Sequence, residues 1–83
     1  MEFVIAVYRS RNVSMSAYNF LSSQGVTCAL ISTPRNANVG CGLSVKLSKS
    51  DWLNYKDTLA SGETFVGFFL VKKTFSGSTL VRL

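Results

Sequence analysis

The sequence has no histidine and only four acidic residues among its 83 positions. Histidine is the commonest general base and a frequent metal ligand, so its absence argues against a metal site and against a conventional catalytic triad. Two of the acids, Asp51 and Asp57, fall at an expected helix opening and on an expected helix surface, where capping and solvation account for them. We therefore expect no cofactor, no metal and no enzyme with its own turnover.

Apolar runs of membrane-spanning length are also missing. The N-terminal run FVIAVY is too short for a membrane span or for the apolar region of a signal peptide. We expect a cytoplasmic protein, and in that reducing compartment the two cysteines, Cys28 and Cys41, should not form a structural disulfide. Cys28 lies inside the apolar run VTCALIS, where a thiol usually serves as a small hydrophobic group.

Negative charge is scarce enough that nine lysines and arginines leave a net charge of +5. Nucleic-acid surfaces usually cluster cations and interleave them with aromatic residues. Here the cations are dispersed, and Lys72-Lys73 is the only adjacent pair. The pattern favours a solvated surface that attracts acidic protein partners over a nucleic-acid surface.

The first third of the chain predicts a strand, a helix and a second strand. FVIAVY (3–8) is rich in β-branched and aromatic residues, and VTCALIS (26–32) has the same character. Between them, apolar residues recur at helical spacing, with Ser14 as the expected N-cap and Gly25 just beyond the expected end.

The rest of the chain repeats this order of elements. GLSVKLS (42–48) alternates as a half-buried strand does, with its serines and lysine on the polar face. Ser48 and Asp51 then have the spacing of a capping box that opens a helix, which Gly62 ends. A long apolar strand, TFVGFFLVKK (64–73), precedes a turn and a short final strand, TLVRL.

With 47% apolar residues, the chain can form a single domain over residues 1–83, and a homodimer would help to stabilise so short a chain. The order of elements predicts an α+β fold: a ferredoxin-like β-α-β-β-α-β sandwich with an extra C-terminal strand. In that topology the second and third strands are neighbours. The segment between them is then the exposed connection of a β-hairpin.

This connection, TPRNANVGCG (33–42), places Cys41 between two glycines. Gly40 and Gly42 can adopt positive φ and turn successive N–H groups toward one point, which would stabilise a thiolate. Arg35 could bring a guanidinium near the sulfur, and either effect would lower the thiol pKa below its ordinary value of about 8.5. The plainer alternative is that the glycines only shape the turn and that Arg35 faces water.

Thr33-Pro34-Arg35, a short spacer and Cys41-Gly42 followed by a strand form a recognisable pattern. With the strand and helix before it and the helix after it, this pattern resembles the bacterial family called putative selenium/sulfur carrier protein-like. Its hallmark is Thr-Pro-Arg followed after a short spacer by Cys-Gly. The chain departs from the family in having Gly40 where a small hydroxylated residue is common, and in its C-terminal segment TFSGSTLVRL.

The resemblance implies a carrier in which Cys41 holds a sulfur or selenium atom as a persulfide or perselenide. A donor such as a cysteine desulfurase would supply the atom, and an acceptor protein would take it. Arg35 would stabilise the anion, and the neighbouring site residues would be Thr33, Pro34, Gly40 and Gly42.

The alternative is a non-catalytic protein-binding or regulatory module on a ferredoxin-like scaffold. Such a module could form a homodimer through the apolar stretch GFFLVKK, although a buried core strand explains that stretch as well.

Overall fold

A computed structural model of the protein describes residues 2–34, 40 and 42–83. These residues form two helices and five strands, in the order β1 (Glu2–Tyr8), α1 (Arg11–Ser23), β2 (Cys28–Ser32), β3 (Leu43–Leu47), α2 (Lys49–Leu59), β4 (Phe65–Thr74) and β5 (Gly77–Arg82). The strands form one sheet in the order β2-β3-β1-β4-β5, and all neighbours are antiparallel. The predicted α+β class, with one antiparallel sheet and an added C-terminal strand, is confirmed.

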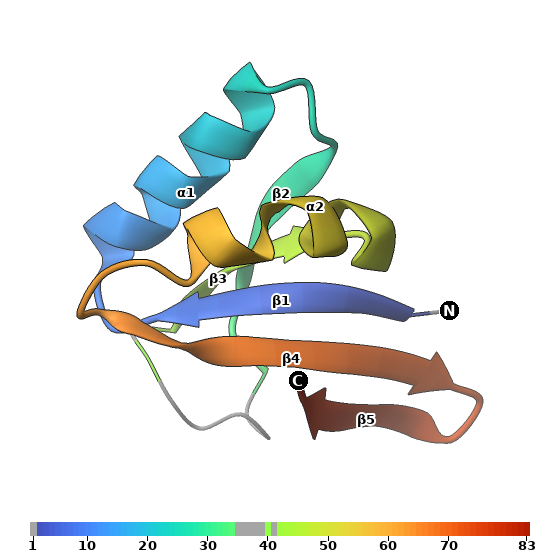
Figure 1. Ribbon diagram of the computed structural model, residues 1–83. Coiled ribbons are helices and arrows are strands. Elements are labelled where there is room, and N and C mark those ends of the chain that lie inside the picture. The colour runs from blue at the N-terminus through green and yellow to red at the C-terminus, as the bar shows by residue number, and fades with distance from the viewer. Residues whose placement is uncertain (1, 35–39, 41) are drawn as a thin grey trace.

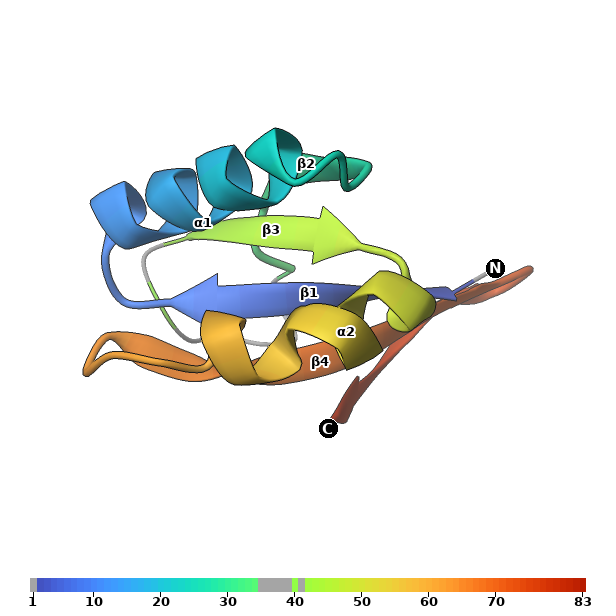
Figure 2. The ribbon, with the colours of Figure 1, turned by 45° about the horizontal axis from the view of Figure 1, so that its top comes forward.

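Both helices lie on the same face of the sheet (Figures 1 and 2). The central strand β1 is nevertheless buried on both faces, since all the side chains from Phe3 to Tyr8 are buried. Val4, Ala6 and Tyr8 belong to the core beneath the helices, whereas Ile5 and Val7 belong to a smaller apolar cluster on the opposite face. This division follows from the alternation of side chains along a strand.

The smaller cluster is capped in part by cations. The Nζ atom of Lys46 lies 4.5 Å from the ring centroid of Phe3, and that of Lys73 lies 5.9 Å from it. Across β4, the Cζ atom of Arg82 lies 5.6 Å from the ring centroid of Phe69. Long basic side chains can cover apolar surface with their stems while their charged ends reach water.

Helix α1 begins earlier than expected. Its N-cap is Ser10, whose hydroxyl accepts a hydrogen bond from the Val13 N–H, so the prediction that Ser14 caps the helix is wrong. Ser14 lies fully buried inside the helix and donates its hydroxyl to the Leu43 carbonyl at 3.0 Å, which ties α1 to the start of β3. Two serines four residues apart both fit a cap position, and tertiary packing selects between them. The expected break after the helix is present at Gly25, with φ 79°.

Helix α2 begins where the sequence predicts. The Ser48 hydroxyl accepts a hydrogen bond from the Asp51 N–H at 3.1 Å and donates to the Asp51 carboxylate at 2.9 Å. The helix ends at Leu59 with Ala60 as its C-cap, two residues before the predicted stop at Gly62.

Strand β4 supplies core residues rather than a free apolar surface. Its segment Gly67–Val71 is buried in the isolated chain, as the core interpretation of GFFLVKK predicts. In the described part of the chain, no helix is both long enough and apolar enough to cross a membrane.

Candidate functional site

The 33–42 segment begins and ends at one end of the sheet, where β2 ends and β3 begins. Strands β2 and β3 pair as antiparallel neighbours with Ser32 opposite Leu43, so the segment is the hairpin connection that the sequence predicts. Strand β1 ends at the same end of the sheet, where Val7 lies opposite Ser44. Arg35 and Cys41, predicted to provide the chemistry, lie outside the described residues, as do positions 36–39.

Two hydrogen bonds close the base of this connection. The Thr33 N–H donates to the Gly42 carbonyl at 2.9 Å, and the hydroxyls of Thr33 and Ser44 are bonded at 2.5 Å. Ser44 is fully buried, although the alternation of its strand places it on the polar face. The hydroxyl of Thr33 provides the partner that a buried polar group requires. Pro34 follows in the chain and is half-buried.

Gly40 lies hard against the end of β1. A Cβ atom built on it would lie 2.7 Å from the Tyr8 carbonyl oxygen and 2.7 Å from Cγ1 of Val7, too close for any side chain. Gly40 has φ 82° and Gly42 has φ 86°, which confirms the predicted positive φ at both positions. A Cβ on Gly42 would meet nothing within 4 Å. Glycine is thus required at position 40 by both space and conformation, and at position 42 by conformation alone.

Cys28 is a free, half-buried thiol. Its sulfur lies 3.6 Å from the Ser22 hydroxyl and 3.8 Å from the Tyr18 carbonyl oxygen, at the contact between α1 and β2. The residue packs against the core under the helices. This environment agrees with the predicted use of Cys28 as a small hydrophobic group.

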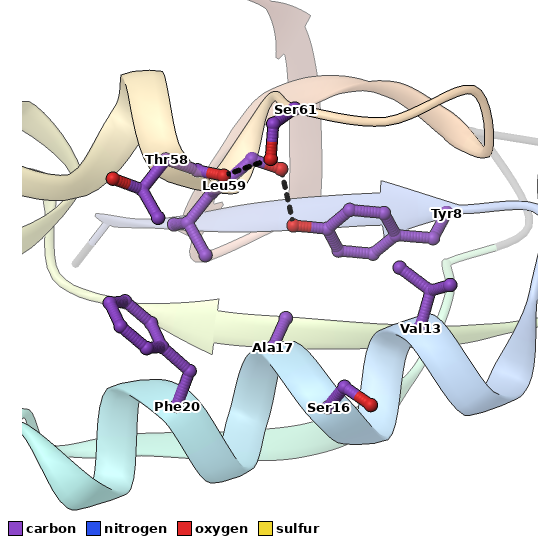
Figure 3. A pocket seen from close by; sticks show the side chains of 8 residues that line it. All are labelled: Tyr8, Val13, Ser16, Ala17, Phe20, Thr58, Leu59 and Ser61. Atoms are coloured by element: carbon purple, nitrogen blue, oxygen red, sulfur yellow. Dashed lines mark hydrogen bonds between the residues drawn. The ribbon is translucent and has the colours of Figure 1, made fainter.

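A cavity of about 200 Å³ separates α1 from the end of α2 (Figure 3). Tyr8 lines it and donates its hydroxyl to the Leu59 carbonyl at 2.7 Å. Burial raises the pKa of Tyr8 to about 12, so the phenol stays protonated at neutral pH and acts as a structural donor.

Within the described residues, no group of three or more histidine, cysteine or acidic side chains could hold a metal ion.

A second cavity, of about 390 Å³, adjoins Gly40 and is lined by two arginines, Arg9 and Arg82. Neither arginine was predicted from the sequence to be functional. No local sequence pattern predicts that these arginines share a cavity. The pairing of β5 with β4 brings Arg82 from the C-terminal strand to this end of the sheet.

Comparison with known proteins gives one match. A family model described as "Putative Se/S carrier protein-like" matches residues 3–66, from β1 into the first residues of β4. No curated protein and no solved structure matches the chain significantly.

Proposed function

Because the chain belongs to the Putative Se/S carrier protein-like family, we propose that it carries a sulfur or selenium atom on Cys41, as a persulfide or perselenide. The scaffold for this chemistry is a ferredoxin-like sandwich with an added strand. The observed order β2-β3-β1-β4 supports this assignment. Helix α1 connects β1 and β2, which β3 separates in the sheet, and helix α2 connects β3 and β4, which β1 separates. Each separating strand is antiparallel to its two neighbours.

The observation that carries the proposal is the state of the two glycines beside Cys41. Gly40 is fixed against the end of β1, where no side chain fits, and Gly42 also has positive φ. Left-handed residues are one component of the backbone nests whose successive N–H groups bind anions. Neither neighbour of Cys41 presents a side chain that would obstruct an approaching protein. These features support a thiolate that is stabilised by backbone dipoles and open to partners.

The transfer step requires no oxidant or reductant. The Cys41 thiolate attacks the outer sulfur of a persulfide on the donor, such as a cysteine desulfurase. A sulfur–sulfur bond forms at Cys41 as the donor's sulfur–sulfur bond breaks, and the donor cysteine leaves as a thiolate. A nucleophile on the acceptor protein later attacks the same outer atom and releases Cys41 as thiolate. The perselenide follows the same sequence of bonds.

Arg35 is the proposed stabiliser of the thiolate and of the carried anion. Its guanidinium is permanently charged and would lower the Cys41 pKa. Replacing Arg35 with alanine should raise that pKa, which is measured by the rate of alkylation of Cys41 as a function of pH in a Cys28→Ser background. An unchanged profile would remove Arg35 from the mechanism.

Loading by a cysteine desulfurase with free cysteine as the sulfur source tests the carrier function. Intact-mass spectrometry should show the wild-type chain gaining the mass of one sulfur atom and Cys41→Ser gaining none. Cys28→Ser is the matched control: it removes the other thiol, whose surroundings are packing contacts, and should load as the wild type does.

The proposal fails if the wild-type chain does not load although the desulfurase turns over. It also fails if Cys41→Ser still loads and Cys28→Ser does not.

A further inference from the structure

The cavity beside Gly40 is not used by the carrier chemistry. Its volume of about 390 Å³ lies within the range of roughly 300–1,000 Å³ that is typical of small-molecule sites. Its walls are formed by Arg9, Gly40, Phe65, Val66 and Arg82. Two of these residues are cations and, among the residues that the structure describes, none that lines the cavity is acidic. The cavity is therefore positively charged with an apolar wall.

Arg9 is held in place from both its backbone and its side chain. It follows directly after β1, and its backbone N–H donates to the Thr64 carbonyl at 2.8 Å. Its Nη2 atom donates to the Glu63 carbonyl at 2.7 Å. Both bonds anchor Arg9 to the residues that precede β4, so little side-chain entropy remains to be lost when a ligand binds.

Arg82, the second cation of the cavity, is also held by a side-chain hydrogen bond to a backbone carbonyl. It lies opposite Phe69 at the end of β5, and its Nη2 atom donates to the Val66 carbonyl at 2.8 Å. A Cβ atom built on Gly67 would lie 3.0 Å from Nη2 and 3.1 Å from Cζ of Arg82. The guanidinium thus occupies space that exists because position 67 has no side chain.

Arg9 and Arg82 are exposed, and within the described residues most of the N–H donors of their guanidiniums are left for water or a ligand. A guanidinium has five N–H donors, and each of these two spends one on a backbone carbonyl. Within the described part of the chain, neither is paired with a carboxylate. Two anchored cations on one cavity repel each other unless an anion lies between them. Arginine forks match the geometry of phosphate and carboxylate oxygens.

We propose that Arg9 and Arg82 form a binding site for the oxyanionic group, phosphate or carboxylate, of a small molecule. Phe65 and Val66 would contact the less polar part of that ligand. Gly40 lines the cavity and precedes Cys41 in the chain, so a bound ligand would contact the residue next to the proposed carrier thiol; this last link rests on the proposed function, whereas binding itself does not. Arg82 lies beyond the residues that the family model matches, so the site is not implied by family membership.

The test is a titration with inorganic phosphate and, separately, with acetate, at constant ionic strength. The Nε–Hε signals of the arginine side chains are followed by NMR. We expect saturable shifts of the Arg9 and Arg82 signals and none of the Arg11 signal. Saturation by phosphate alone identifies a tetrahedral oxyanion as the ligand group, and saturation by acetate identifies a carboxylate.

Variants separate a built site from general attraction to a basic protein. Arg9→Ala and Arg82→Ala should each weaken binding about tenfold or more, because each loses charge-assisted hydrogen bonds. Arg11→Ala is the control: it removes the same single charge from an exposed residue that does not line the cavity, and it should leave binding unchanged. Gly67→Ala keeps every charge but displaces the Arg82 guanidinium, so it should also weaken binding.

Equal weakening by the three arginine substitutions with no effect of Gly67→Ala, or shifts that do not saturate with either probe, would overturn the proposal. The Cys41→Ser chain should bind the oxyanion as the wild type does. The wild-type chain distinguishes the two claims: failure to load sulfur with intact oxyanion binding contradicts only the carrier function, and sulfur loading without oxyanion binding contradicts only this site.

Discussion

At the scale of single residues, the two glycines that flank Cys41 are constrained to different degrees. Both have positive φ, but only Gly40 also lies against the backbone of β1. A side chain at either position would carry the conformational cost of a positive φ, but only a side chain at position 40 would also clash with β1. The comparison measures how firmly the residue before Cys41 is held against the sheet.

We expect Gly42→Ala to lower the free energy of unfolding by about 1–2 kcal/mol, the cost of a left-handed alanine. Gly40→Ala should cost clearly more, because its methyl group would lie 2.7 Å from the Tyr8 carbonyl oxygen. Urea denaturation of both variants measures the two free energies. Equal losses would show that Gly40 is not wedged against β1.

A second residue-scale prediction concerns Tyr8. Tyr8→Phe removes the hydrogen bond to the Leu59 carbonyl and should lower stability by about 1 kcal/mol, or the melting temperature by roughly 4–8 °C for a chain of this size. A loss below the error of the melting curve would mean that water replaces this hydrogen bond at no cost.

The same variant changes the dependence of stability on pH. Burial raises the Tyr8 pKa from 10.0 to about 12, so above pH 10 the unfolded phenol ionises while the folded one stays protonated. The contribution of Tyr8 is therefore complete below pH 10 and is lost as pH rises toward 12. Tyr8→Phe should lack this component. Identical slopes of stability against pH in the two chains, measured over that window, would contradict the assigned burial of the phenol.

At the scale of elements, the base of the β2–β3 connection depends on a buried pair of hydroxyls. Thr33 begins the predicted Thr33-Pro34-Arg35 motif, yet its hydroxyl is bonded to Ser44 within the hairpin. This assigns Thr33 a structural contact at the root of the 33–42 segment. The strength of that contact can be measured without altering any charge.

Thr33→Val and Ser44→Ala each leave one buried hydroxyl without this partner, so each should destabilise the chain by about 1–3 kcal/mol. The double variant removes both hydroxyls and should cost less than the sum of the single changes. A double-mutant cycle from urea denaturation gives the coupling energy. Strict additivity would show that the two hydroxyls do not depend on each other in solution.

Local signals predicted the elements unevenly. Alternation marked β3 and the spacing of Ser48 and Asp51 marked the start of α2, because both depend on residues adjacent in the chain. The start of α1 was misplaced, since Ser10 and Ser14 both resemble caps and burial against β3 selects between them. Ser44 is buried on the other face of the sheet, opposite Val7 and bonded to Thr33, and its position on the polar side of β3 did not predict that burial.

At the scale of the whole molecule, the sheet places residues that are distant in sequence close together at one of its ends. The residue after β1, a glycine before β3, the first two residues of β4 and the last residue of β5 all line the cavity beside Gly40. The sequence predicted the α+β class and the hairpin connection, but not the arginine pair, because the register of β5 on β4 is a tertiary property. The roles of Cys41 and Arg35 stay predictions from motif and family.

The most direct test of the carrier function locates the transferred atom within the chain. After loading by a desulfurase, persulfides are blocked by alkylation and the protein is cleaved with trypsin. Cleavage after Arg35 separates the two thiols, with Cys28 in peptide 12–35 and Cys41 in peptide 36–46. Mass spectrometry should find the additional sulfur on peptide 36–46 and none on peptide 12–35. Additional sulfur on peptide 12–35, or on neither peptide, would contradict the account.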